Sequence, residues 1–448
     1  MRIYFISLGC DKNLVDSEYM LGLLRDAGHV LTEDEAEAEV IVVNTCCFIH
    51  DAKEESIETI LEAASYKAKE QGNCRVLIVT GCLAERYRGE IMAEIPEVDA
   101  VLGTASFDEV ILALNRCVAG EKTEVYKDLT YLPLPETKRV NTTYGYTAYL
   151  KIADGCEKFC TYCVIPSIRG RYRSVPMERI IEEAEQLAKD GAKELILVAQ
   201  ETTLYGVDLY GRKMLPELLR RLCAIEGPEW IRLLYCYPEE ITDELITVMK
   251  EEKKICRYLD LPIQHASDTV LKRMGRRTTK KDLVRLIKKL RRMLPGMALR
   301  TSLITGFPQE TEEEHKELLA FVEEMKFERL GVFTYSKEEN TPAAKMKGQV
   351  PAREKRRRQK ELMKLQQGIA FCKTEERIGK RYIVLIEGKL PGENVYLART
   401  YMDAPGIDGY LFVESEERYE SGEFVKVKVT GARGYDLMGV NVEKKKII

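Results

Sequence analysis

The sequence predicts an α/β protein in three parts: an N-terminal doubly wound parallel-sheet domain, a partial (β/α) barrel, and a small C-terminal antiparallel β-barrel. Two patterns lead to this prediction. Short apolar runs alternate with amphipathic stretches over most of the chain, whereas the last part has short alternating runs separated by Gly and Pro. The length of 448 residues, of which 45% are hydrophobic, suffices for about three domains with separate cores.

Residues 1–120 contain four apolar runs, each followed by a stretch with helical periodicity. Runs that are apolar throughout are typical of strands buried on both faces in a parallel sheet. We therefore expect the doubly wound domain here. The expected strands are residues 3–8, 40–44, 75–80 and 98–102, and the first three expected helices are residues 14–27, 52–71 and 84–93.

Residues 121–144 lack helical or strand periodicity and include Pro133 and Pro135, so we expect a linker there. Residues 145–378 then hold six strand–helix units, fewer than the eight of a closed (β/α) barrel, and predict a partial or open barrel. Its expected strands are residues 147–153, 194–199, 230–235, 258–262, 298–305 and 329–334, and a long charged helix follows at residues 352–377.

Residues 379–448 change in character. Five short runs of alternating polarity predict a small antiparallel barrel, a fold that often binds RNA or protein. The expected strands are residues 382–387, 394–400, 409–413, 424–430 and 437–442.

The composition narrows the function. Lys and Arg number 69 and Asp and Glu 73, and this near balance argues against a protein that coats nucleic acid through bulk charge. No apolar run approaches the roughly 18 residues of a membrane helix, and the N-terminus does not resemble a signal peptide, so we expect a cytoplasmic protein. The 13 cysteines should then be mostly reduced thiols. With only 4 histidines, any metal centre should be rich in thiolate.

Three cysteines follow the first expected strand of the barrel in the pattern CxxxCxxC: Cys156, Cys160 and Cys163. Barrel chemistry takes place at the C-terminal ends of the strands, where this loop lies. An iron–sulfur cube usually binds four thiolates, so three would leave one iron free to hold a small molecule. Zinc is the alternative, but it needs a fourth ligand, and the next Cys or His along the chain is Cys223.

A second set of three cysteines is spread over the N-terminal domain. Cys10, Cys46 and Cys82 each follow an expected strand. Parallel strands end at one edge of their sheet, about 4.7–4.9 Å apart, so three thiolates there predict a second cluster with one open iron. The alternative is three ordinary buried cysteines. Cys47 competes with Cys46, which lies closer to its strand.

Other candidate positions are less distinctive. Gln200, Glu201 and Gly306 lie at strand ends, where they either contact a cofactor or form ordinary turns. His265 also follows a strand, and we expect it to be a hydrogen-bonded structural residue. We interpret the remaining cysteines as packing residues: Cys74, Cys117, Cys223, Cys236, Cys256 and Cys372.

Two basic runs lie in the second half of the chain. Residues 272–292 contain 11 Lys and Arg and one acid, Asp282, and residues 353–360 contain six basic residues in eight. Such runs are usually solvated helix faces, and the alternative is contact with ribosomal RNA.

The CxxxCxxC loop resembles the signature of the radical SAM superfamily, in which one electron cleaves S-adenosylmethionine to a 5'-deoxyadenosyl radical. Nearly the whole chain resembles the methylthiotransferases, a branch of that superfamily. The second set of cysteines lies in motifs similar to those of this branch: Gly9-Cys10, Asn44-Thr45-Cys46 and Gly81-Cys82-Leu83-Ala84-Glu85-Arg86-Tyr87.

The resemblance implies three domains. They are an N-terminal methylthiotransferase domain at residues 1–120, a radical SAM core with a trailing basic helix at residues 145–378, and a TRAM domain at residues 379–448. It also implies two 4Fe-4S clusters and S-adenosylmethionine. The implied ligands are Cys10, Cys46 and Cys82 for the auxiliary cluster, Cys156, Cys160 and Cys163 for the radical SAM cluster, and Gln200, Glu201 and Gly306 for S-adenosylmethionine.

Three stretches resemble the members of the family that modify a ribosomal protein. They are Asp11-Lys12-Asn13, where tRNA-acting relatives usually read Gln-Met-Asn, then residues 198–206 and residues 403–409. Glu201, Gln309 and Gly406 depart from the usual Asp, Gly and Glu at their positions. The implied activity is methylthiolation of the β-carbon of an aspartate in the twelfth small-subunit ribosomal protein.

The implied partners are that ribosomal protein, held through the TRAM domain, and an electron donor such as flavodoxin or ferredoxin. Residues 380–443 carry 8 basic against 11 acidic residues, and the lysines at 444–446 bring the sum to zero, which suits a basic protein better than RNA. Three alternatives stay open. They are a tRNA adenosine methylthiotransferase with the same cluster ligands, a non-catalytic iron–sulfur electron carrier, and a zinc-stabilised ribosome-binding protein.

Overall fold

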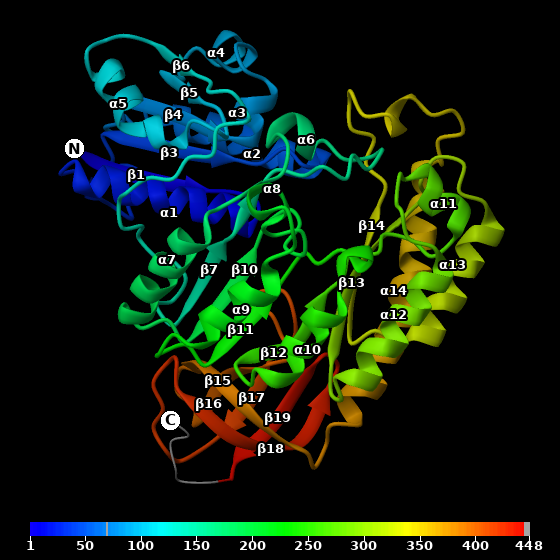
Figure 1. Ribbon diagram of the computed structural model, residues 1–448. Coiled ribbons are helices and arrows are strands. Elements are labelled where there is room, and N and C mark those ends of the chain that lie inside the picture. Colours follow the sequence, from blue (N-terminus) through cyan, green and yellow to red (C-terminus); the bar gives the residue numbers. More distant parts are fainter. Residues whose placement is uncertain (69, 443–448) are drawn as a thin grey trace.

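The computed structural model describes residues 1–68 and 70–442. Figure 1 shows three layers: the N-terminal sheet at the top, the central barrel in the middle and the C-terminal barrel at the bottom. The predicted fold class is confirmed by the sheets of these layers. Among the described residues, no helix is long and apolar enough to cross a membrane.

The N-terminal domain is built on a parallel sheet with helices on both faces. Its strands, in spatial order, are β2 (Val30–Leu31), β1 (Arg2–Ser7), β3 (Val40–Thr45), β4 (Val76–Gly81), β5 (Ala100–Leu102) and β6 (Thr123–Val125). One face carries α1 (Asp11–Asp26) and α5 (Val110–Val118), and the other carries α2 (His50–Ser65) and α3 (Cys82–Arg86). Successive side chains of a strand alternate in direction. Val40 and Val42 therefore join the core under α1, and Ile41 and Val43 join the core under α2.

Two edge strands and one helix break differ from the sequence prediction. β2 and β6 are too short to show a period, and β6 lies inside the expected linker, where it pairs with β5. The helix expected over residues 84–93 is split into α3 and α4 (Glu90–Glu94), with Gly89 just before the second piece. Gly weakens a helix by about 1 kcal/mol relative to Ala, which favours a break there. The helix expected to reach residue 71 ends at Ser65.

The central domain is an open barrel of six parallel strands, as predicted. In spatial order these are β7 (Thr147–Lys151), β10 (Glu194–Val198), β11 (Trp230–Leu233), β12 (Ile255–Asp260), β13 (Ala298–Thr305) and β14 (Arg329–Thr334). The helices that pack against them are α7 (Met177–Lys189), α9 (Leu215–Cys223), α10 (Asp243–Glu251), α12 (Lys280–Met293) and α13 (Glu312–Met325). Both α12 and α13 begin with a capping box, Thr279 with Asp282 and Thr311 with Glu314, which satisfies free backbone N–H groups.

The basic run at residues 272–292 lies mostly in α12, next to the acidic helix α13 (Figure 1). Lys280 pairs with Glu317 at 3.1 Å, and Lys288 pairs with Glu324 at 3.0 Å. Two of the 11 basic residues of the run are therefore engaged in ion pairs between these two helices. The lysines that form these pairs are not a free basic surface.

The C-terminal domain follows α14 (Ala352–Glu375) and forms a closed five-stranded barrel. Its strands, in spatial order, are β15 (Arg381–Lys389), β16 (Val395–Thr400), β17 (Leu411–Glu414), β19 (Asp436–Asn441) and β18 (Phe424–Arg433). Four of its pairings are antiparallel, as predicted, whereas β17 and β19 are parallel. The exception arises because β18 runs back between them along the chain, so that β17 and β19 point the same way.

The C-terminal barrel lies at the end of the central barrel that is opposite to the N-terminal sheet (Figure 1). A buried ion network fixes it there, because Glu194 of β10 accepts from Arg232 at 2.7 Å and from Arg399 of β16 at 2.6 Å. All three side chains are fully buried. The single tryptophan of the chain, Trp230, packs edge-on against Phe424 with ring centroids 4.9 Å apart. It is a built-in probe of this contact.

Replacing Glu194 with Ala should loosen the C-terminal barrel, because two buried guanidinium groups would lose their shared carboxylate. Removing one partner of a buried ion pair typically costs about 3–5 kcal/mol. We expect the fluorescence of Trp230 to shift to longer wavelength at a lower urea concentration than in the wild type. The control is Glu185→Ala on the exposed face of α7, which should behave as the wild type does. Equal midpoints for the two variants would refute the role given to Glu194.

Candidate metal centres between the first two domains

The three cysteines singled out in the N-terminal domain come together at one edge of its sheet. Cys10 follows β1, Cys46 follows β3, and Cys82 begins α3 directly after β4; these three strands are neighbours. We call them the N-terminal triad. Burial raises the pKa of the Cys82 thiol to about 12. The Arg169 guanidinium opposes this rise, and the thiols of Cys46 and Cys10 add to it. A Cβ atom on Gly9 would lie 3.0 Å from the Sγ of Cys46, so the turn before Cys10 touches Cys46.

Glycine precedes two members of the triad because the chain turns there with a positive φ. Gly9 has a φ of +90° and Gly81 a φ of +93°. A Cβ atom on Gly9 would lie 2.8 Å from the Cβ of Cys46, and one on Gly81 would lie 2.3 Å from the Oδ1 of Asn44. Both distances are shorter than van der Waals contact, so any other residue would push these loops apart.

The structure distinguishes Cys46 from its neighbour Cys47. Ser56 of α2 accepts from the amide of Cys46 at 3.0 Å and donates to its carbonyl at 2.8 Å, which fixes this loop. The side chain of Cys46 lies against Gly9. Cys47 is fully buried in the apolar core beneath α2, and burial raises the pKa of its thiol. Of the two, Cys46 is the one that faces the Cys10 loop.

The second set of cysteines, Cys156, Cys160 and Cys163, lies on the loop after β7 and β8 (Ala153–Asp154). We call it the barrel triad. Gly155 precedes it with a φ of +78°, and a Cβ atom there would lie 2.1 Å from the carbonyl oxygen of Arg171. The amide of Ile165 donates to the Sγ of Cys163 at 3.4 Å. Burial raises the pKa of Cys156 to about 11, so the positive charge of a bound metal is needed to remove its proton at neutral pH.

The donor chemistry of both triads fits iron–sulfur clusters. Each triad offers thiolates alone, which are the usual ligands of such clusters. Within residues 1–68 and 70–442, no three or more His, Cys, Asp or Glu side chains gather around one metal-ion position. Three thiolates also leave one iron of a cube without a protein ligand.

One buried arginine connects the two triads. Arg169 follows α6 (Ile165–Ile168) and donates from Nη1 to Asp16 at 2.6 Å and to Asp154 at 3.2 Å. Its Nη2 donates to the side-chain oxygen of Asn13 at 2.8 Å. Asn13 and Asp16 lie in α1, just after the first member of the N-terminal triad, and Asp154 lies just before the barrel triad. A single guanidinium thus joins the loops that carry both sets of thiols.

A second cation completes this network. Lys151, at the end of β7, pairs with Asp16 and lies 3.4 Å from Asp154. Although burial raises the pKa of Asp154, Lys151 and Arg169 together hold it well below its usual range. The other oxygen of Asp154 accepts from the amide of Gly155 at 2.9 Å. The network therefore also fixes the turn that begins the barrel triad.

Two of the three positions expected to contact a cofactor lie beside the barrel triad. Gln200 donates to Asp154 at 2.9 Å. Glu201 is fully buried, with its Oε2 3.5 Å from the Nζ of Lys158 and no hydrogen bond from any described residue to that oxygen. Burial raises the pKa of Glu201 to about 8, although Lys158 lowers it. Gly306, with a φ of +72°, follows β13 and lies against α14 instead.

The sequence analysis missed Arg169 and the carboxylates that it contacts. Arg169, Arg171 and Arg173 alternate in one loop, and no pattern in the sequence separates them. In the structure, the side chain of Arg169 is 2% exposed and that of Arg171 is 76% exposed. Only the packing of α1 against this loop selects the buried one. His265 is fully buried and accepts from the amide of Ser267 at 2.9 Å, as expected of a structural residue.

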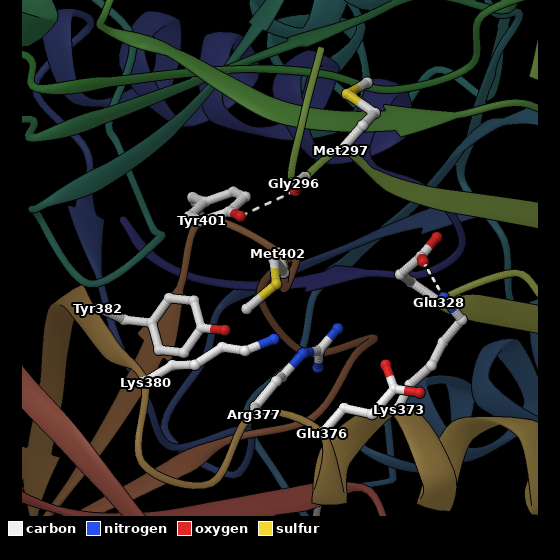
Figure 2. A pocket seen from close by; sticks show the side chains of 10 residues that line it. All are labelled: Gly296, Met297, Glu328, Lys373, Glu376, Arg377, Lys380, Tyr382, Tyr401 and Met402. Atoms are coloured by element: carbon white, nitrogen blue, oxygen red, sulfur yellow. Dashed lines mark hydrogen bonds and ion pairs between the residues drawn. The ribbon is translucent and has the colours of Figure 1, made fainter. Parts of the chain in front are cut away.

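A cavity lies at the far end of the central barrel, between that barrel, α14 and the C-terminal domain (Figure 2). The residues that line it are Gly296, Met297, Glu328, Lys373, Glu376, Arg377, Lys380, Tyr382, Tyr401 and Met402. The hydroxyl of Tyr401 donates across it to the carbonyl of Gly296 at 2.8 Å. None of the positions that the sequence singled out lines this cavity.

Three family models match the chain. They are described as "Uncharacterized protein family UPF0004" at residues 2–103, "Radical SAM superfamily" at residues 150–322 and "TRAM domain" at residues 378–442. Curated relatives match over nearly the full length. A "Ribosomal protein uS12 methylthiotransferase RimO" from Lachnoclostridium phytofermentans is 66% identical, over 98% of this chain and 99% of the relative. Its namesake from Pelotomaculum thermopropionicum is 52% identical, over 99% of both chains.

Solved structures of other radical SAM enzymes share the fold. The methyltransferase TsrM from Kitasatospora setae superposes with a TM-score of 0.56 at 16% identity, covering 74% of this chain and 72% of that one. The cobalamin-dependent enzyme OxsB superposes with a TM-score of 0.50 at 12% identity, covering 81% of this chain and 56% of that one. At these identities the likeness concerns the fold alone.

Gly81 should tolerate Ala poorly because the backbone and Asn44 approach it closely. Gly120 is the matched control, since it has a similar φ of +87° and no atom lies within 4 Å of the place that its Cβ would take. Both Ala variants incur a backbone cost for their positive φ, and the cost is larger at Gly81, because its ψ of −153° is adopted almost only by glycine. Only Gly81→Ala adds an overpacking cost of about 1–3 kcal/mol. Thermal unfolding should therefore show a lower midpoint for Gly81→Ala than for Gly120→Ala, and a reversed order would contradict the close approach.

Proposed function

The chain belongs to the RimO family of radical SAM methylthiotransferases, and we propose that it methylthiolates the β-carbon of an aspartate in ribosomal protein uS12. It is thus a transferase of the radical SAM type. The relatives that support the substrate are 51–66% identical over nearly their whole length and are named for uS12. A tRNA adenosine methylthiotransferase is the alternative, because it would use the same two sets of thiols.

The observation that carries the mechanism is the pairing of two thiol triads across Arg169. We propose that the barrel triad binds one 4Fe-4S cluster together with S-adenosylmethionine, and that the N-terminal triad binds a second 4Fe-4S cluster. When bound, these groups supply the electron that cleaves S-adenosylmethionine and an open iron site for the sulfur that is transferred. Since Arg169 contacts Asp16 and Asp154 at once, it keeps the two sites in a fixed relation.

The residues beside the barrel triad suit the amino acid end of S-adenosylmethionine. Glu201 has one buried oxygen that no described residue donates to, and it lies at the end of β10 near Lys158. An ammonium group needs such an acceptor. Gln200 is oriented by its bond to Asp154, and its side-chain oxygen accepts from no described residue. We propose that both residues orient the cofactor, and that Gly306 shapes the turn after β13, where it packs against Lys355 of α14.

Three partner proposals follow from the family and from the arrangement of the domains. The TRAM domain lies at the end of the barrel away from the triads (Figure 1). We therefore propose that it binds a part of uS12 that is distant from the reacting aspartate. A small one-electron donor such as flavodoxin or ferredoxin supplies the electron. We propose that the basic residues of α12 and α14 that are not engaged in ion pairs contact ribosomal RNA. A ribosomal protein substrate places the reaction in the cytoplasm.

The substrate is tested by one competition experiment. The anaerobically reconstituted enzyme, a reductant, sulfide and S-adenosylmethionine are mixed with a peptide of the aspartate loop of uS12 and with bulk tRNA. We expect mass spectrometry to find the methylthio group on the peptide and none on the tRNA. Modification of the tRNA alone would move the chain to the tRNA-acting branch of the family.

Single substitutions distinguish the roles proposed for the two triads. Cys160→Ala should abolish the cleavage of S-adenosylmethionine, because the barrel triad then lacks a ligand. Cys46→Ala should leave cleavage intact and abolish the methylthio product. The adjacent Cys47→Ala is the matched control and should still form product, since Cys47 packs in the apolar core. 5'-Deoxyadenosine is measured by chromatography and the product by mass spectrometry. Product from Cys46→Ala, or none from Cys47→Ala, would mean that the triad has been assigned wrongly.

A further inference from the structure

Three lysines are buried in the described part of the chain, and one of them has no counter-charge. Lys151 pairs with two carboxylates and Lys158 pairs with three. Lys12 is just as buried, with 6% of its surface exposed, but no described residue offers its Nζ a hydrogen bond or an ion pair. The Nζ itself is not fully buried, so it can reach a ligand that enters the junction and compensates its charge.

An aromatic ring stands where a carboxylate would be expected. The Nζ of Lys12 lies 3.3 Å from the centre of the Tyr235 ring. The face of an aromatic ring attracts a cation but is only a weak hydrogen-bond acceptor. The three N–H bonds of the ammonium group are therefore left for another acceptor. The hydroxyl of Tyr235 donates to Asp11 at 3.0 Å, which orients the ring under the cation. Lys12 forms no ion pair with Asp11.

The backbone of Tyr235 is strained, with a φ of +57°. Surrounding contacts impose this conformation: its amide donates to Asp260 at 3.2 Å, and its carbonyl accepts from the amide of Thr202 at 3.1 Å. Non-glycine residues with positive φ are held in this way mainly at binding and catalytic sites. The ring beneath Lys12 is therefore a fixed platform.

This contact lies where the two halves of the proposed site meet. Lys12 is in the first turn of α1, two residues after Cys10 of the N-terminal triad. Tyr235 follows β11, at the same end of the central barrel as the barrel triad. The unpaired cation thus faces the junction at which the N-terminal domain covers the strand ends.

We propose that Lys12 binds the side-chain carboxylate of the aspartate that the enzyme modifies and so holds its β-carbon beside the N-terminal triad. This inference rests on the proposed function and adds the residue that recognises the substrate. S-Adenosylmethionine is the other source of a carboxylate, but the residues proposed for it, Gln200 and Glu201, lie beside the barrel triad. A neutral nucleobase would bring no charge to pair with Lys12, so this residue also selects a protein substrate over tRNA.

The test compares Lys12→Met with the wild type on two peptides of the uS12 loop, one with the target Asp and one with Asn in its place. Lys189→Met, on the exposed surface of α7, controls for the loss of a positive charge. Peptide affinity is measured by fluorescence anisotropy on the reconstituted enzyme with S-adenosylmethionine present, and KM and kcat are measured on the Asp peptide. The affinity for S-adenosylmethionine alone is measured in parallel.

We expect Lys12→Met to weaken the binding of the Asp peptide by about ten- to a hundredfold, which is the usual effect of losing a charge-assisted hydrogen bond. The change should fall on the Kd and KM of the peptide. The Asn peptide should bind wild type and Lys12→Met alike, and Lys12→Arg should restore part of the preference for Asp. In the wild type alone, the Asp peptide should bind more tightly than the Asn peptide by the same factor.

Three results would overturn this inference: equal binding of the two peptides to the wild type, an equal loss for both peptides in Lys12→Met, or a loss of affinity for S-adenosylmethionine with peptide binding unchanged. The wild-type comparison does not depend on the folding of any variant. If the wild type modifies the peptide and Lys12 makes no difference between Asp and Asn, only this inference fails. If the wild type modifies tRNA instead of the peptide, the proposed function fails first.

Discussion

A single buried guanidinium holds the two halves of this site together. Arg169 lies between Asp16 of the N-terminal domain and Asp154 of the barrel loop. Buried charges are tolerated only when each finds partners with good geometry. Here Lys151 supplies the second positive charge and the side-chain oxygen of Asn13 accepts from the remaining nitrogen. Because these groups lie in or next to the segments that carry the thiols, the same contacts that join the domains also fix the relation between the two triads.

Both triads use one local solution on two different sheets. A strand ends, a glycine with positive φ turns the chain, and a cysteine follows, as at Gly9, Gly81 and Gly155. Each turn brings the chain close enough to a neighbouring loop that a side chain in place of the glycine would collide with it. The C-terminal ends of parallel strands meet at one edge, where ligands commonly bind. Placing two such edges face to face creates a junction with thiols on both sides and Lys12 between the domains.

The sequence predicts the features that local residue patterns determine. It does not predict the features that depend on packing between distant segments. Apolar runs locate all six central strands. The CxxxCxxC spacing predicts the barrel triad, and the positions of Cys10, Cys46 and Cys82 after expected strands predict the N-terminal triad. Arg169 cannot be told from Arg171, two residues away in the same loop, because only the docking of α1 buries one of them. Lys12 was noted as part of a motif, but its missing counter-charge is visible only in three dimensions. The edge strands β2 and β6 are too short to show a period, and the parallel pair β17–β19 depends on how the barrel closes.

The most direct test of two separate clusters is to count iron and sulfide after anaerobic reconstitution. The wild type is compared with two variants, each of which replaces the three cysteines of one triad by Ala. If each triad binds its own 4Fe-4S cluster, the wild type should hold about eight irons per chain and each variant about four. The account would be contradicted if the wild type held about four irons that disappear when either triad is removed, or if it held zinc and no acid-labile sulfide.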